Sequence, residues 1–208
     1  KKNKIIVVRG GVDTSPAKKY FEQGDFIPIT NRHYDACFVG RLHYQKGVLE
    51  LIHIWGTVCK KIPKSRLAII GMGPLDGEIR SLIKQMGLQL NITLLGFLNG
   101  IEKFDVFKQS KIILHPATYD SGGMAPAEGM AWGLPGVSFD LEALKTYYPK
   151  GILKTKCFDL DAFASNILYL LSNPDAHLTL SQEASKLIRD YWDWDHQAKN
   201  IFHQTIKL

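Results

Sequence analysis

The amino-acid sequence predicts an α/β fold, a doubly wound parallel sheet with helices on both faces. Short apolar runs recur along the chain, and stretches whose apolar residues have helical spacing separate most of them. Strands that alternate with helices favour a parallel sheet that is covered on both sides. In such sheets ligands bind beyond the carboxyl ends of the strands, so functional residues are expected in the turns that follow the apolar runs.

Each apolar run is short and bounded by turn residues, which is typical of a buried strand. The candidate strands are residues 5–8, 36–39, 67–70, 92–95, 112–114 and 137–139. Apolar residues three and four positions apart predict helices. The candidate helices are residues 48–60, 79–86, 104–107, 126–132, 160–171, 178–191 and 193–206. The Asn-Pro-Asp stretch at 173–175 is expected to stop one closing helix and to cap the next.

Length and composition are those of a globular domain. With 208 residues the chain is long enough to bury a sizeable core, and no stretch approaches the length of an apolar membrane span. We expect no signal peptide. Cys37, Cys59 and Cys157 are widely spaced, which favours a reducing compartment and a place for each in the core. These features predict a cytoplasmic protein, either free or at the inner membrane surface.

The net charge of +6 is spread along the chain. It favours anionic ligands or an anionic membrane surface, so peripheral membrane contact stays open. No arginine cluster is interleaved with aromatic residues, and no nucleic acid partner is expected. No histidine shares a metal-ligand spacing with another His, Cys or carboxylate, so no metal is predicted.

The most informative stretch, residues 112–140, runs from a strand through an acidic, glycine-rich turn into a helix. Asp120, Gly122 and Gly123 lie in the turn and Glu128 lies in the helix. The two carboxylates offer acceptors for hydroxyl groups, and the glycines allow a ligand to approach closely. The alternative interpretation is that these are ordinary turn and surface residues. His115, at the end of the strand, either lines the same site or packs in the core.

The start of this helix is a candidate anion site. Backbone N–H groups at a helix start are unpaired and carry partial positive charge, so a docked phosphate would be stabilised there. The residues that would supply these N–H groups are Gly123, Met124 and Ala125. Together with the carboxylates, this predicts a ligand that has both a phosphate and sugar-like hydroxyl groups.

A cationic loop, residues 40–47 with the sequence GRLHYQKG, follows the candidate strand at 36–39. Arg41 and Lys46 lie on one loop and can converge on a pair of phosphates, since Arg binds phosphate as a bidentate fork and Lys as a compact charge. The alternative is that both are solvated loop charges.

A third turn imitates a dinucleotide fingerprint. Gly71, Gly73 and Gly77 follow a candidate strand, but their spacing is GxGxxxG rather than GxGxxG. A Rossmann site also needs an acid at the end of the next strand, where this chain has Gly96 and Phe97. We therefore assign Gly71 and Gly73 to close backbone approach rather than to a dinucleotide site.

These stretches, in this order and register, resemble glycosyltransferase family 4, also called glycosyltransferase group 1. The family commonly carries GRLxxxKG, a GxGP turn, a strand ending GF or GY, and the signature PSxYEGFGLPxLEAMAxGxPVV. The positions that match this signature are Pro116, Tyr119, Gly123, Glu128, Met130, Ala131, Gly133 and Pro135. Asp120 stands where the family usually has Glu, Gly122 where it has Phe, and Gly136 where it has Val.

The resemblance implies the carboxy-terminal, donor-binding half of a GT-B enzyme, a Rossmann-like domain. Residues 1–34 would be an inter-domain linker with a first strand, and residues 35–208 a nucleotide-sugar-binding domain with carboxy-terminal helices. The amino-terminal domain that holds the acceptor would be absent from this chain, and the isolated half would be inactive.

The activity implied is retaining transfer of a hexose, such as mannose or glucose, from a nucleoside diphosphate sugar. The acceptor would be a glycan or a lipid-linked saccharide, as in polysaccharide biosynthesis. No cofactor and no metal would be needed. Two alternatives stay open, a glycosidase that uses Asp120 and Glu128, and a non-catalytic module that only binds a nucleotide sugar.

The resemblance also implies roles for single residues. Arg41 and Lys46 would contact the diphosphate, Asp120 would hold sugar hydroxyls, and Glu128 would hold the ribose. The remaining donor-binding candidates are Gly40, Gly71, Gly73, Phe97, Leu98, Gly122, Gly123, Met124 and Ala125. For Phe97 a place in the core is an equal alternative to contact with the base.

Overall fold

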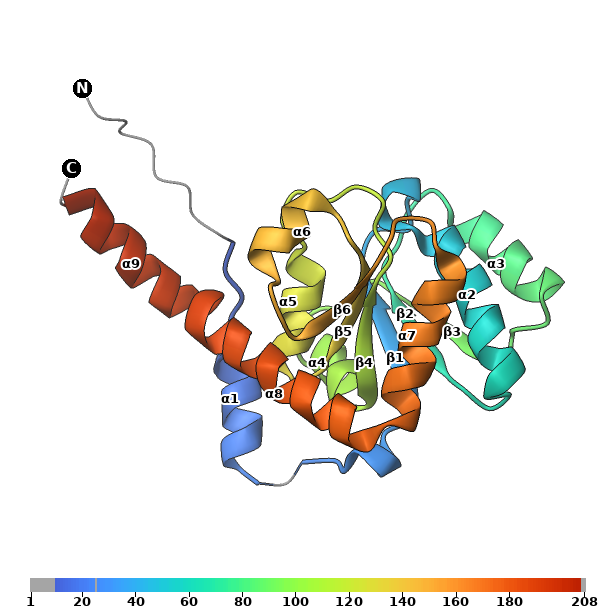
Figure 1. The fold of residues 1–208 in the computed structure, drawn as a ribbon, viewed down its shortest axis with the longest axis horizontal. Coiled ribbons are helices and arrows are strands. Elements are labelled where there is room, and N and C mark those ends of the chain that lie inside the picture. Colours follow the sequence, from blue (N-terminus) through green and yellow to red (C-terminus); the bar gives the residue numbers. More distant parts are fainter. Residues whose placement is uncertain (1–9, 25, 207–208) are drawn as a thin grey trace.

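A six-stranded parallel sheet forms the centre of the computed structural model, which describes residues 10–24 and 26–206. Its strand order is β3-β2-β1-β4-β5-β6, and every neighbouring pair is parallel (Figure 1). The strands are β1 (Tyr34–Val39), β2 (Leu67–Ile70), β3 (Ile92–Gly96), β4 (Ser110–His115), β5 (Gly136–Phe139) and β6 (Ile152–Thr155). The strand expected at residues 5–8 lies outside the described residues.

Helices join these strands and close the chain. The α-helices are α1 (Ser15–Glu22), α2 (Val48–Lys61), α3 (Asp76–Gln85), α4 (Gly100–Lys108), α5 (Met124–Ala131), α6 (Glu142–Tyr147), α7 (Leu160–Ser172), α8 (Pro174–Tyr191) and α9 (Trp194–Ile206). Two 3₁₀ turns are η1 (Ile29–Asn31) and η2 (Tyr44–Lys46). The predicted doubly wound architecture is thus confirmed.

Side chains alternate between the two faces of the sheet, and each face packs on its own group of helices. Phe38 of β1 lies in one cluster with residues of α2, α3 and α7. Its neighbour Cys37 lies in the other cluster, with residues of α1, α4, α5, α6 and α8. The apolar runs of the sequence are continuous because both faces of every central strand are buried.

The strand order reverses at the junction of β1 and β4, which are neighbours in the sheet. The chain leaves β1 toward α2 on one face and leaves β4 toward α5 on the other. Loops that diverge in this way leave a crevice beyond the carboxyl ends of the two strands. The loop at residues 40–47 and the turn at residues 116–123 both begin at this crevice.

Besides the two 3₁₀ turns, the α-helices α1 and α6 and the strand β6 were not expected from the sequence. The cap assignment at residues 173–175 was wrong in part, because the Asn173 side chain donates to the carbonyl of Tyr169 at the end of α7 and does not cap α8. Pro174 instead opens α8 as its first residue. Of the cysteines, only Cys37 is fully buried, whereas Cys59 and Cys157 are half-buried.

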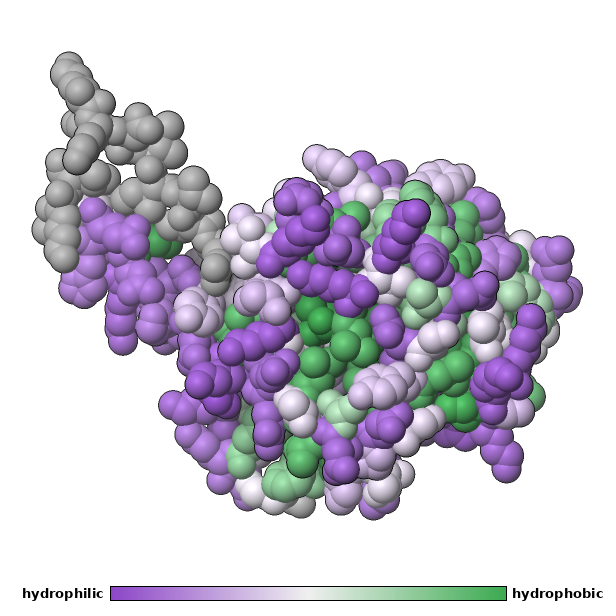
Figure 2. Space-filling view, in the orientation of Figure 1, coloured by the Kyte–Doolittle hydropathy of each residue, from purple (hydrophilic) through white to green (hydrophobic). Residues whose placement is uncertain are grey.

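The first described residues pair with the junction between α8 and α9. The Val12 N–H donates to the carbonyl of Trp192, and the Trp194 N–H donates to the carbonyl of Val12. From this junction α9 runs away from the body of the domain (Figure 1). Figure 2 shows hydrophilic residues over most of the same face, with apolar ones gathered near its middle and again toward the side of α2. No helix among the described residues is long and apolar enough to cross a membrane.

Candidate functional site

The cationic loop lies directly beyond β1 and is shaped by a single 3₁₀ turn. His43 caps the start of η2, and its Nδ1 accepts from the Gln45 N–H at 3.3 Å. Gly47 ends η2 in the left-handed region, at φ +62°, and α2 starts at the next residue. Arg41 is exposed, and no hydrogen bond or ion pair of its side chain occurs among residues 10–24 and 26–206.

This loop is joined to the acidic turn beyond β4. The carbonyl of Gln45 accepts from the N–H groups of Thr118 and Tyr119, at 3.0 and 3.3 Å. A Cβ added to Gly47 would lie 1.8 Å from the carbonyl oxygen of Pro116, so the two backbones touch where a side chain has no room. Two stretches about 70 residues apart in sequence therefore form one continuous surface.

Asp120 lies at the centre of this surface and accepts from both stretches. Its Oδ1 accepts from the N–H groups of Gly122 and Gly123, at 3.0 and 2.8 Å. Its Oδ2 accepts from the Lys46 ammonium at 2.7 Å, and the Nε2 atom of His115 lies 3.2 Å from the same oxygen. The buried His115 ring, 2% exposed, has no hydrogen bond at Nε2 among the described residues.

These neighbours keep Asp120 ionised. Burial would by itself raise the pKa of its carboxyl group, but His115, the Lys46 ammonium and the N–H groups of Gly122 and Gly123 together hold the pKa well below its usual range. Asp120 thus stabilises the turn, which agrees with the alternative interpretation of it as an ordinary turn residue. The same carboxylate also faces the cationic loop.

The helix start beyond this turn is partly occupied by the chain itself. The Gly123 N–H is one of the donors predicted for an anion, but in the structure it donates to Asp120. Met124 and Ala125 are the first two residues of α5, whose N–H groups have no partner within the helix. Of the three N–H groups predicted to bind an anion, only those of Met124 and Ala125 are therefore left for it.

Glu128 lies one turn further along α5 and faces α4. Its Oε2 accepts from the Lys103 ammonium at 2.9 Å. Both side chains line a cavity of about 230 Å³ whose walls also include Met124 and the aromatic rings of Phe104 and Trp132. The cavity offers a charged pair beside an apolar wall, which suits a ligand with hydroxyl groups and a flat ring.

The turn beyond β2 packs on the cationic loop. A Cβ at Gly71, where φ is +145°, would lie 1.8 Å from the Gly40 carbonyl oxygen, and one at Gly73 would lie 2.4 Å from that of Leu42. The close approach assigned to these glycines is thus, in the structure, an approach to the cationic loop. Phe97 follows β3 and is 67% exposed, so its alternative place in the core is wrong.

Two supporting residues were not expected from the sequence. Lys103 pairs with Glu128 across two helices, 25 residues away. The Tyr148 hydroxyl, at the end of α6, donates to the carbonyl of Gly123, and burial raises the pKa of this phenol well above its ordinary value. Neither residue lies in a glycine-rich turn, so no local pattern indicated it.

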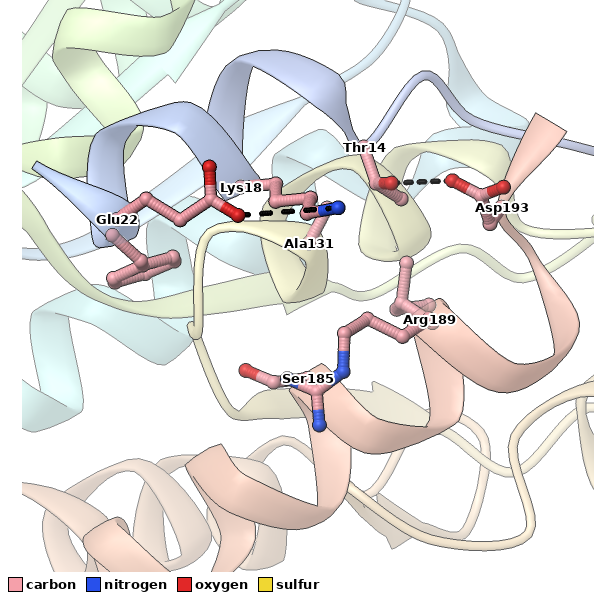
Figure 3. A pocket seen from close by; sticks show the side chains of 9 residues that line it. Thr14, Lys18, Glu22, Ala131, Ser185, Arg189 and Asp193 are labelled. Carbon is pink, nitrogen blue, oxygen red and sulfur yellow. Dashed lines mark hydrogen bonds and ion pairs between the residues drawn. The ribbon is translucent and has the colours of Figure 1, made fainter. Parts of the chain in front are cut away.

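A larger cavity, of about 470 Å³, lies elsewhere in the molecule. Figure 3 shows that α1 and α8 line it, with Lys18 and Glu22 on one side and Arg189 and Ser185 on the other. None of the predicted site residues lines this cavity. In the described part of the chain no three His, Cys, Asp or Glu side chains gather where they could hold a metal ion.

The chain is similar to curated proteins along most of its length. It is 27% identical over 184 residues to an uncharacterized glycosyltransferase of Methanocaldococcus jannaschii, covering 82% of this chain and 45% of that one. It is 26% identical over 184 residues to alpha-monoglucosyldiacylglycerol synthase of Acholeplasma laidlawii, covering 87% and 44%. The chain therefore spans less than half the length of these relatives.

Solved structures share the fold. A structure of Anabaena HepE in complex with UDP and glucose superposes with a TM-score of 0.78 at 17% identity, covering 98% of this chain and 57% of that one. The carboxy-terminal domain of a group 1 glycosyl transferase (LpcC) of Francisella tularensis gives a TM-score of 0.71 at 18% identity, covering 88% of this chain and 100% of that one. The family Glycosyl transferases group 1 matches residues 22–187. Because this match extends over more than half of the chain, the protein belongs to the glycosyl transferases group 1.

Proposed function

We propose that the chain is the donor-binding half of a retaining hexosyltransferase. It would bind a nucleoside diphosphate sugar, carrying mannose or glucose, and present it to a glycan or lipid-linked saccharide held by an amino-terminal domain. The domain division at residue 35, the cytoplasmic location and peripheral membrane contact belong to the same proposal. One relative, the poly(glycerol-phosphate) alpha-glucosyltransferase of Bacillus subtilis, is a transferase of a hexose to a polymer by its name.

One observation carries this proposal. The cationic loop and the acidic turn meet beyond the carboxyl ends of β1 and β4, at the reversal of strand order where open α/β sheets bind their ligands. Arg41, exposed on this loop, and Lys46 supply two cations a few residues apart, beside the start of α5. This combination suits a diphosphate.

The chemistry that we propose is electrostatic. When the bond between the sugar C1 and the diphosphate oxygen breaks, negative charge grows on the leaving diphosphate. Arg41, Lys46 and the N–H groups of Met124 and Ala125 would stabilise that charge, and preorganised donors of this kind lower the barrier most where charge develops. The proposal requires no metal and no cofactor for this step.

The rest of the donor would extend along the same edge of the sheet. Asp120, with Gly122 and Gly123, would lie at the sugar, and Glu128 would hold the ribose hydroxyls. Phe97, exposed beyond β3, and Leu98 would contact the base, while Gly40, Gly71 and Gly73 keep the neighbouring loops close together.

Calorimetric titration of the chain with UDP, GDP and ADP, with and without a chelator, tests the proposal. We expect one diphosphate to bind selectively and independently of metal. Arg41→Ala should weaken that binding about tenfold to a hundredfold, because it removes a charged hydrogen-bonding partner. Arg66→Ala, an exposed arginine at the amino end of β2, is the matched control. Absence of binding, or equal effects of the two variants, would contradict the proposal.

Two other functions predict different results. A module that only binds a nucleotide sugar would give the same titration result as the proposed transferase. An assay of sugar transfer, made after an amino-terminal domain is supplied, distinguishes the module from the transferase. A glycosidase needs a protonated general acid near neutral pH. The neighbours of Asp120 hold its pKa low instead, which disfavours that role for it.

A further inference from the structure

Lys46 has two competing partners. In the structure its ammonium group is bound to Asp120 at 2.7 Å, and the pair is well shielded, with side-chain exposures of 24% and 10%. In the proposed function the same ammonium binds the donor's diphosphate. An ammonium on a flexible stem can turn from one anion to the other, but the contact with Asp120 must weaken when it does.

The acceptor positions of the Asp120 carboxylate are all used or covered while Lys46 is bound to it. A carboxylate offers about four acceptor positions. Two are used by the N–H groups of Gly122 and Gly123 and one by Lys46. The buried His115 ring lies 3.2 Å from Oδ2 without a hydrogen bond to it and covers the last position, so that only 10% of the Asp120 side chain is exposed. A sugar hydroxyl could therefore reach this carboxylate only after Lys46 has left.

We infer that Asp120 makes the site discriminate between a nucleotide sugar and the bare nucleoside diphosphate, by competing with the diphosphate for Lys46. This inference rests on the proposed function. It assigns to Asp120 a role in specificity, in addition to contact with the sugar.

The physical reason is that the two ligands differ in whether they replace the hydrogen bond that Asp120 loses when Lys46 leaves it. When a bare diphosphate draws Lys46 away, Oδ2 of Asp120 loses its best donor and remains as a partly buried charge beside a new anion, which is costly. When the ligand carries a sugar, a hydroxyl group replaces the ammonium at Oδ2. The hydrogen bonds from the N–H groups of Gly122 and Gly123 keep the carboxylate in place in both cases, and the His115 ring stays beside it.

This competition weakens product binding more than substrate binding. The nucleoside diphosphate that remains after transfer lacks the hydroxyl groups that satisfy Asp120. Lys46 then returns to Asp120, and the product is released more easily.

Neutral variants of Asp120 give a result opposite to that of an ordinary ligand residue. In Asp120→Asn we expect the bare diphosphate selected in the titration above to bind about threefold to tenfold more tightly, because Lys46 is no longer held by a charge. The added affinity of the matching nucleotide sugar over the bare diphosphate should fall toward onefold. Asp120→Ser, whose hydroxyl can still accept from the turn, serves as a second neutral variant should the first not fold.

Asp35 provides a matched control. Its Oδ1 binds Lys111 at 2.7 Å, with side-chain exposures of 17% and 24%, and its Oδ2 accepts from the Arg66 N–H. This pair lies at the amino ends of β1 and β4, on the opposite edge of the sheet. Asp35→Asn should leave both affinities unchanged. In a Lys46→Met background there is no ammonium to compete for, so adding Asp120→Asn should leave the affinity for the bare diphosphate unchanged.

The outcomes separate the two proposals. If the unmodified chain binds a diphosphate and Arg41→Ala weakens that binding, but Asp120→Asn leaves it unchanged or weaker, the competition is overturned while the proposed function stands. If the unmodified chain binds none of the three diphosphates, both are overturned.

Discussion

Gly47 and Gly77 show how differently single glycines act in this protein. Gly47 closes the cationic loop at φ +62°, and an added Cβ would lie 1.8 Å from the carbonyl oxygen of Pro116. Gly77, in the first turn of α3, has an ordinary φ and no neighbouring atom within 4 Å of an added Cβ. The first position demands glycine for both its conformation and its contact, whereas the second only loses helical propensity by having it.

We therefore predict that Gly47→Ala lowers the free energy of unfolding by about 2 to 4 kcal/mol, since a strained φ and a backbone collision add together. Gly77→Ala should raise it by about 0.5 to 1 kcal/mol. Urea denaturation followed by circular dichroism measures both. Equal midpoints for Gly47→Ala and the unmodified chain would show that the two loops do not touch as described.

Asp120 makes stability depend on pH. Its pKa is lower in the folded chain than in the unfolded chain, so the ionised carboxylate stabilises the fold above its unfolded pKa of about 3.9. This contribution is lost as the pH falls through and below that value. The stability advantage of the unmodified chain over Asp120→Asn should therefore shrink between about pH 6 and pH 2. Urea denaturation of the two chains at several pH values measures this difference, and a difference that stays constant would contradict the low pKa of Asp120 in the folded chain.

Single residues also show which features of the candidate site can be predicted from the sequence and which cannot. Arg41 and Lys46 are predictable candidates because they lie a few positions apart on one loop. The bond of Lys46 to Asp120 joins residues 74 positions apart, and no local pattern contains that pairing. The departure at Gly136 has a physical cause as well, because a Cβ there would lie 2.6 Å from the Ile152 side chain on β6.

At the scale of elements, strong patterns were predicted and short ones were missed. β1 and β2 are apolar runs buried on both faces, and α7 is a long amphipathic helix, so each has an unmistakable sequence signal. β6 is a four-residue edge strand whose two middle residues are half-buried, and α6 has six residues. Such elements form because the sheet and the helices beside them offer a place, which the local sequence does not encode.

The N-cap of α7 offers a prediction at this scale. The Asp159 side chain accepts from the Ala162 N–H at 3.0 Å and satisfies one of the unpaired donors at the helix start. Asp159→Ala should lower the free energy of unfolding by about 1 kcal/mol. Asp161→Ala, two positions later and exposed, should change it by less than about 0.5 kcal/mol. If chemical denaturation shows the reverse order, the cap does not stabilise α7.

At the scale of the whole molecule, the place of the candidate site follows from the fold class. Parallel strands direct every carboxyl end to one edge, so the glycine-rich turns predicted from separate stretches had to meet there. The cavity between α1 and α8 could not be foreseen in this way. It is closed by a contact of Thr14 with Asp193, 179 residues apart, and α1 carried no strong signal of its own.

The central strand allows global unfolding to be measured chemically. Cys37 of β1 is fully buried, and burial raises the pKa of its thiol to about 12. We predict that iodoacetamide modifies Cys59 and Cys157 in the folded chain, whereas Cys37 reacts only at the rate of global opening. Mass spectrometry of labelled peptides gives the three rates. A Cys37 rate close to the other two would contradict the closed packing of β1.

The direction of α9 has an optical consequence. The four tryptophans divide sharply, because Trp55 and Trp192 are 0% exposed and Trp132 is 5% exposed, while Trp194 at the start of α9 is 61% exposed. A collisional quencher such as acrylamide should therefore extinguish the emission of one indole and leave the other three. If α9 lies against another protein surface, the quenchable part of the fluorescence disappears, so the chain carries its own reporter of that contact.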